Sequence, residues 1–131
     1  MNEILTGIFS KLSGGTALVS ALGGTAIYHM QAPEGAALPY VVYSHAGGGD
    51  ENLTPSRLIN VVYNVRAYAD DAKEAWTVMG LVDSLLHGGT VTVTGYTNFW
   101  CARENFWELT DNTGAETIYA AGAYYRIRLD S

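Results

Sequence analysis

The residues that most resemble a chemical site are three consecutive glycines, Gly47 to Gly49, followed directly by Asp50 and Glu51. A glycine-rich loop that holds phosphate needs a lysine and a serine or threonine right after its glycines, at the start of a helix. Two carboxylates occupy that place here, and they would repel phosphate. The sequence therefore predicts a surface loop that becomes ordered on contact with a partner, and not a nucleotide site.

The histidines and the cysteine are the next candidates for reactive groups. His29, His45 and His87 are far apart, and no pair has the spacing that places two imidazoles on one helical face. The histidines near strand ends are expected to be hydrogen-bonded and partly buried. Cys101 lies in the aromatic segment NFWCARENFW, where a cysteine is usually a small buried hydrophobe. No zinc site and no cysteine nucleophile is predicted.

The sequence gives no better support for a nucleophilic serine or for a catalytic pair of carboxylates. The chain has no Gly-x-Ser-x-Gly motif, which would present a nucleophilic serine. Of the adjacent acids, Asp50–Glu51 fits a polar loop and Asp70–Asp71 fits a helix start, where acids are favoured by the helix dipole. We therefore predict no catalytic residue, no metal and no cofactor. A small ligand-binding or hydrolytic domain remains the alternative from a different class.

The elements that would position these groups follow from hydrophobic periodicity. The first 22 residues predict two short helices divided by Ser13-Gly14-Gly15, with Thr16 capping the second and Gly23-Gly24 ending it. Leu38-Pro39 favours extended geometry, which delivers the chain into a strand. Asp71 and Glu74 have capping-box spacing at the start of a long helix. Strands are predicted at 26–30, 40–46, 58–68, 91–93, 96–109 and 117–129, and the long helix at about 71–87.

These elements predict an α/β fold of the α+β type. Within 58–68, Ile59, Val61 and Tyr63 alternate with polar residues, as a sheet with one dry face requires. We expect an antiparallel or mixed sheet, with the N-terminal helical segment and the long helix packed on one face. Residues 110–114, TDNTG, have the composition of a turn, so the last two strands should form a long C-terminal β-hairpin.

Length and charge restrict the kind of partner. The 131 residues are most simply one domain, residues 1–131. The formal net charge is −6 and the pI about 4.8, which disfavours direct binding of DNA or of an anionic membrane. The start lacks the features of a secretory signal, and no apolar run approaches the ~18–20 residues of a membrane span. The chain is expected to be made and used in the cytoplasm, or in something assembled there.

Aromatic and basic residues on the strands are the best candidates for a docking surface. Tyr124, Arg126 and Arg128 share one face of the last predicted strand, and tyrosine and arginine dominate protein–protein hot spots. Most of the aromatics should simply pack. The candidate oligomer or partner interface comprises Tyr40, Tyr43, Gly48, Asp50, Glu51, Arg57, Arg66, Tyr124, Arg126 and Arg128.

Three segments in fixed order carry a resemblance. They are LVSALGGTAIYHMQAPEGAALPYVVY, INVVYNVRAYADDAKEAWTVMGLVDSLL and the terminal AAGAYYRIRLDS. This layout resembles the tail-completion, or tail-terminator, proteins of long-tailed bacteriophages. It spans about 100 residues, and the LPYVVY segment, Leu38–Tyr43, is its most specific part.

The resemblance implies a structural virion protein located in the tail or neck and assembled in the host cytoplasm. It implies a homo-oligomeric ring, with six copies expected, that caps the head-proximal end of the tail tube and ends its polymerisation. The implied partners are the tube protein and the head connector or stopper, and DNA passes through without specific binding. The family has no catalytic residues to transfer. We hypothesise that Asp50 and Glu51 line the channel. Another neck component, an adaptor or stopper, is the nearest alternative.

Overall fold

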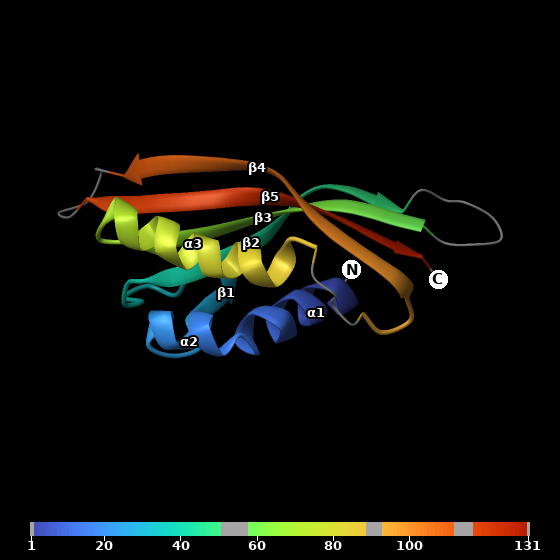
Figure 1. Ribbon diagram of the computed structural model, residues 1–131, viewed down its shortest axis with the longest axis horizontal. Coiled ribbons are helices and arrows are strands. Elements are labelled where there is room, and N and C mark those ends of the chain that lie inside the picture. Colours follow the sequence, from blue (N-terminus) through green and yellow to red (C-terminus); the bar gives the residue numbers. More distant parts are fainter. Residues whose placement is uncertain (1, 51–57, 89–92, 112–116, 131) are drawn as a thin grey trace.

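The architecture is a five-stranded sheet with three helices on one side (Figure 1). The computed structural model describes residues 2–50, 58–88, 93–111 and 117–130. The strand order is β1-β2-β3-β5-β4, with β1 parallel to β2 and every other neighbouring pair antiparallel. The predicted α+β class with a mixed sheet is confirmed. The elements are α1 (Asn2–Ser13), α2 (Thr16–Leu22), β1 (Ile27–His29), β2 (Tyr40–Asp50), β3 (Leu58–Ala69), α3 (Ala72–Leu86), β4 (Thr97–Asp111) and β5 (Ile118–Asp130).

The N-terminal segment forms two helices, as predicted, and they meet at an angle of 79°. Gly15 lies at the junction, where a β-carbon would collide with the side chain of Leu85 on α3. The prediction that Thr16 caps α2 is wrong, because the N-cap residue is Gly15 and no side chain makes a capping hydrogen bond. Gly23 ends α2 in the left-handed conformation, with φ of 74°.

Helix α3 begins and ends close to the predicted 71–87. The Asp71 carboxylate accepts a hydrogen bond of 3.1 Å from the backbone N–H of Lys73, which satisfies one of the free donors at the helix start. Gly88, with φ of 69°, follows the C-terminus. Among the described residues, no single helix is long and apolar enough to cross a membrane, and only α1 and α2 taken together as a bent pair meet that test.

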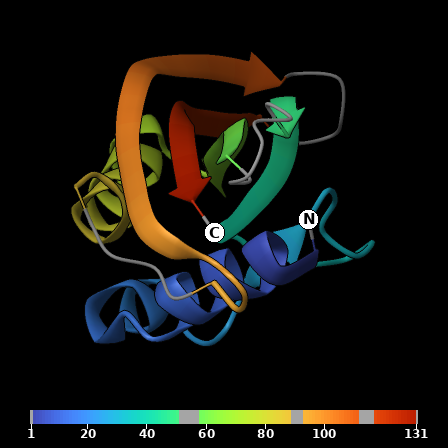
Figure 2. The ribbon, with the colours of Figure 1, turned by 90° about the vertical axis from the view of Figure 1, so that its right-hand side faces the viewer.

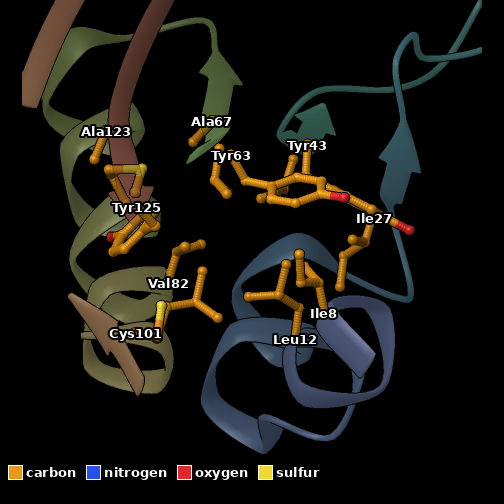
Figure 3. Packing of buried hydrophobic residues seen from close by; sticks show 14 of the residues in the cluster. Ile8, Leu12, Ile27, Tyr43, Tyr63, Ala67, Val82, Cys101, Ala123 and Tyr125 are labelled. Atoms are coloured by element: carbon orange, nitrogen blue, oxygen red, sulfur yellow. The ribbon is translucent and has the colours of Figure 1, made fainter. Parts of the chain in front are cut away.

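One face of the sheet packs against all three helices and forms the core (Figure 3). The predicted alternation in β3 is confirmed: Ile59, Val61, Tyr63, Val65 and Ala67 are all buried. They meet residues from the helices and from β5, and the labelled side chains in Figure 3 converge between the sheet and the helices. Further members of this cluster are Ile4, Ile8, Leu12, Leu18, Val78, Met79, Val82, Leu86, Ala121, Ala123, Tyr125, Ile127 and Leu129.

The glycine run corrects a sequence prediction. Gly47 to Gly49 do not form a loop but continue β2 and pair with β3, with Gly48 opposite Val61. A register shift between His45 and Gly47 marks a β-bulge. Gly48 has φ of 82°, and a β-carbon there would collide with the carbonyl oxygen of Asn60. Glycine is needed because two backbones approach too closely for any side chain.

The C-terminal strands form the predicted hairpin, and β4 pairs with β5 as far as Asp111 opposite Ile118. Strand β4 has two register shifts, begins near α1 and bends sharply along its course, while it pairs with β5 from Thr97 onward (Figures 1 and 2). Val93 lies in the core but belongs to no strand, which corrects part of the strand predicted at 91–93. The rest of that prediction and most of the predicted turn lie outside the described residues.

Candidate assembly interface

The face of the sheet opposite the helices carries five of the ten predicted interface residues. In β3, Arg66 pairs with Val42 of β2 on one side and with Gly122 of β5 on the other. The same register places Tyr40 beside Tyr68. Side chains that alternate with the core positions must point away from the helices. This open face therefore contains Tyr40, Arg66, Tyr124, Arg126 and Arg128 from the sequence prediction, together with Asn60, Asn64, Tyr68 and Trp107.

Arg66 is held on the open face by three hydrogen bonds. Its Nε donates to the Tyr68 hydroxyl at 3.0 Å, Nη1 to the Ser44 hydroxyl at 2.9 Å, and Nη2 to the Met30 carbonyl oxygen at 3.2 Å. Two of these partners are 22 and 36 residues away in the sequence, so only the folded sheet brings them together. All three acceptors are neutral oxygen atoms. The guanidinium is thus fixed in place without its charge being compensated there.

A hollow of about 440 Å³ lies beside this guanidinium. Its walls combine the tyrosines at positions 40 and 68 with the loop that follows β1. Burial, helped by the neighbouring Tyr68, raises the pKa of the Tyr40 hydroxyl above its ordinary value, so Tyr40 stays neutral at physiological pH. Val42, at the base of the hollow, is only 2% exposed although it lies outside the core cluster. The hollow is a defined recess and not a flat patch of sheet.

On the part of the open face formed by β3, β5 and β4, polar side chains bond to one another within the subunit. The indole of Trp107 covers Gly122, where a β-carbon would collide with the ring, and its Nε1 donates to the Asn64 side-chain oxygen at 3.2 Å. Arg126 donates to the side-chain oxygen of Asn60 at 2.7 Å and forms an ion pair with Glu104 at 3.1 Å. An aromatic ring over a strand glycine restores contacts that the glycine lacks.

Strand β4, at one edge of the sheet, carries three of the large hydrophobic side chains that remain exposed. Trp100 is 50% exposed, Phe106 43% and Leu109 57%. Phe106 is partly supported, because Arg103 stacks on its ring at 4.2 Å. Sequence reasoning did not select these residues, since strand aromatics usually pack. The signal in NFWCARENFWEL was that its aromatic residues fall on both faces of the strand, so they cannot all be buried.

The remaining predicted interface residues do not join the open face. Tyr43 points to the helices and is only 5% exposed, and burial raises the pKa of its hydroxyl. Gly48 lies in the β2–β3 ladder, and the backbone of Asp50 pairs with Ile59. Glu51 and Arg57 lie outside the described residues. These placements leave the open face and the β4 edge as the accessible surfaces to consider.

Catalytic groups do not converge in the described part of the chain. No three His, Cys, Asp or Glu residues there are grouped closely enough to hold a metal ion. Burial raises the pKa of the Cys101 thiol to about 12, which keeps it protonated and unreactive. The prediction that His29 and His45 are partly buried is wrong: both are exposed, with their rings against Tyr43 and Tyr63 respectively.

Asp83 connects the C-terminal half of α3 to the sheet. Its carboxylate accepts a hydrogen bond of 2.8 Å from the buried Tyr125 hydroxyl and pairs with Arg103 at 2.7 Å. The backbone N–H of Arg103 donates to Nδ1 of His87 at 2.9 Å. Each polar group in this cluster is hydrogen-bonded or ion-paired to another group of the same subunit. The cluster therefore supports the fold and offers no free nucleophile.

The described residues form a small module with one covered sheet face, an open face of anchored polar groups and an exposed apolar edge. Comparison with known proteins identifies its family. The family model described as "Tail completion protein gp17" matches residues 6–129, and the chain belongs to this family. The resemblance noted in the sequence is thereby confirmed. The protein is a structural component of the phage tail, located in the tail or neck of the virion.

Solved structures share the fold. A chain from the virion of a native gene transfer agent particle matches with a TM-score of 0.74 and 17% identity, over 96% of this chain and 93% of that one. A second solved chain matches with a TM-score of 0.61 and 13% identity, over 96% of this chain and 94% of its own. No curated protein matches the sequence.

Proposed function

We propose that copies of this chain form a closed ring that caps the head-proximal end of the tail tube. The ring ends polymerisation of the tube and offers the head connector a surface on which to dock. The whole described chain serves as one domain in this role, with no catalytic step and no cofactor. Six copies are the expected number.

The exposed edge of β4 is the observation that carries this proposal. Its 15 residues form the outermost strand of the sheet, so one side of its backbone has no strand partner among the described residues. On that side, only the Cys101 carbonyl and the Arg103 N–H are known to be bonded, to Gly88 and His87. Long edge strands with exposed apolar side chains favour pairing with another chain. Trp100 and Leu109 lie toward opposite ends of this strand, each half exposed or more. Covering them against a neighbouring copy removes apolar surface from water.

Charge supports the passage of DNA without binding. Each copy contributes a formal charge of −6, so a ring of copies is strongly acidic. An acidic wall repels the phosphate backbone and lowers the residence time of DNA in the channel. Asp50 and Glu51 remain our candidates for the lining. Replacing both with lysine should slow DNA ejection, and an unchanged rate would remove them from that role.

The double variant Trp100→Glu/Leu109→Glu tests ring formation. Two carboxylates on the β4 edge should prevent its burial, so the variant should sediment as a single subunit at concentrations where the unmodified chain forms a ring. Ala21→Glu, on the exposed side of α2, is the matched control and should leave assembly unchanged. Circular dichroism verifies that each variant is folded. Rings that persist in the folded double variant would exclude the β4 edge as the contact.

Purified tail-tube subunits test the capping role. Added during polymerisation, the unmodified ring should shorten the tubes and appear at one end of each in electron micrographs. The Trp100→Glu/Leu109→Glu variant should not shorten them. Binding to the portal side, with tube length unchanged, would instead favour the neck-adaptor alternative.

A further inference from the structure

The charge of Arg66 has no counter-charge in the described part of its own chain. Arg103 pairs with Asp83 and Arg126 with Glu104, whereas the three hydrogen bonds of Arg66 all go to neutral oxygens. A guanidinium carries five N–H donors. The three bonds use Nε–H and one N–H on each terminal nitrogen, so one donor on Nη1 and one on Nη2 remain. Both remaining donors can bond to the oxygen atoms of an incoming carboxylate.

The hollow beside Arg66 provides room for an incoming side chain. It measures about 440 Å³ and is lined by polar side chains, among them Gln31, Tyr40 and Tyr68, and by apolar groups that include Pro33 and Ile118. Glu34 is the carboxylate that lines it, and it lies on an exposed turn without an ion pair to Arg66. A charge pair in a recess partly walled by aromatic and apolar groups is screened less by water than one on a flat surface. The site is therefore suited to a carboxylate brought by another polypeptide.

We propose that the Arg66 hollow receives a carboxylate from the neighbouring copy in the ring, supplied by Asp70 or Glu74 at the start of α3. This inference rests on the proposed ring. Both acids are exposed, and neither forms an ion pair with a described residue of its own chain. The adjacent Asp71 is already engaged as the cap of α3.

The placement of the two surfaces suits a contact between copies. The open face and the helices lie on opposite sides of the sheet, and a ring of identical subunits joins two different surfaces of each copy head to tail. Strand β3 runs toward the end of the molecule where α3 begins, so Arg66 and the start of α3 lie at the same end of the long axis (Figure 1). If the ring axis is parallel to the long axis of the subunit, the Arg66 hollow of one copy and the start of α3 in the next copy lie at the same level along the ring axis.

Charge reversal tests this pairing. Arg66→Glu should raise the concentration at which the ring dissociates by about 30-fold or more, as expected when one partner of a sheltered charge pair is lost. Adding Asp70→Arg and Glu74→Arg to that variant should restore the dissociation concentration to within a few-fold of the unmodified ring. Lys11→Glu, a reversal of equal size on α1, is the control and should have little effect. Analytical ultracentrifugation at two salt concentrations measures all four.

A second pair of substitutions guards against a fold defect in Arg66→Glu, because that change also removes three internal hydrogen bonds. Asp70→Asn/Glu74→Gln leaves Arg66 untouched and should weaken the ring by a similar factor. Rings of normal affinity in this variant would overturn the inference while leaving the ring itself in place. So would a folded Arg66→Glu variant that the added arginines fail to rescue. An unmodified chain that stays a single subunit at every concentration would overturn the ring and this pairing together.

Discussion

The two faces of the central sheet differ in what their side chains do. On the helix side, β3 presents Val61, Tyr63 and Val65, each at most 1% exposed. On the open side the same strand presents Asn64 and Arg66, which are half-buried and bound to groups from other strands. Residues adjacent in sequence thus point to opposite faces of the sheet and have different surroundings. One face stabilises the subunit, while the other holds polar groups that we propose to contact a partner.

Two consecutive tyrosines show the difference most directly. Tyr125 is fully buried and donates its hydroxyl hydrogen to Asp83 at 2.8 Å. Tyr124 is half-buried on the open face, opposite Asn64 and Asn105 on the flanking strands. The residue type is the same, and only the parity along the strand separates a core residue from a surface residue. Composition alone therefore says little about which aromatics are available for assembly.

Replacing Tyr125 should give the largest loss of stability. Tyr125→Ala removes a buried ring and the hydrogen bond from its hydroxyl to Asp83, which keeps only its pairing with Arg103, so we expect the free energy of unfolding to fall by about 3–5 kcal/mol. Tyr124→Ala is the matched control and should cost under about 1 kcal/mol. Urea denaturation measures both. Equal losses at the two positions would contradict the division of the sheet into a structural and an assembly face.

Substitution within the glycine run should have a smaller but clear effect. Gly48→Ala places a methyl group against the Asn60 carbonyl in a left-handed conformation, which should cost about 1–3 kcal/mol. Gly47→Ala is the control, because a β-carbon there meets no atom within 4 Å. Thermal unfolding compares the two variants. A neutral Gly48→Ala would show that β2 does not approach β3 as closely as described.

Alkaline pH should lower stability, and only above neutrality. Burial raises the pKa of the Cys101 thiol from its usual 9.0 to about 12, and that of the Tyr63 hydroxyl from 10.0 to about 12. The unfolded chain releases these protons first, so the free energy of unfolding should be constant near pH 7 and decrease between about pH 9 and 12. Cys101→Ala should reduce the slope just above pH 9. An unchanged slope in this variant would mean that the thiol is accessible to solvent.

Local patterns predicted most of the secondary structure. The period of 3.6 residues located the helices, and the period of two located β3 and its dry face. The Asp71 cap could be predicted because its hydrogen bond joins residues only two positions apart in the sequence. The prediction for Gly47–Gly49 was wrong because glycine signals a loop and a strand bulge equally well. Only the position of Asn60 on the neighbouring strand decides between them.

The sequence predicted only part of the candidate interface, again because the pairing of strands decides which side chains are exposed. The sequence placed Tyr124, Arg126 and Arg128 on one face, since residues two apart on a strand point the same way. It also selected Tyr43, which the pairing of β2 with β1 and β3 turns toward the helices. It did not select Trp100 or Leu109, because the edge position of β4 follows from the order of strands in the sheet.

By itself, the sequence determined the helices, the strands, the absence of a recognisable catalytic motif and the likeness to a tail-completion family. Each of these depends on residues close together in the chain or on the order of segments. Tertiary structure alone decided that Arg66 meets Ser44 and the Met30 carbonyl, that a hollow forms beside it, and that β4 is left at the edge. These features depend on which strands become neighbours, and that is set by the packing of the whole sheet against its helices.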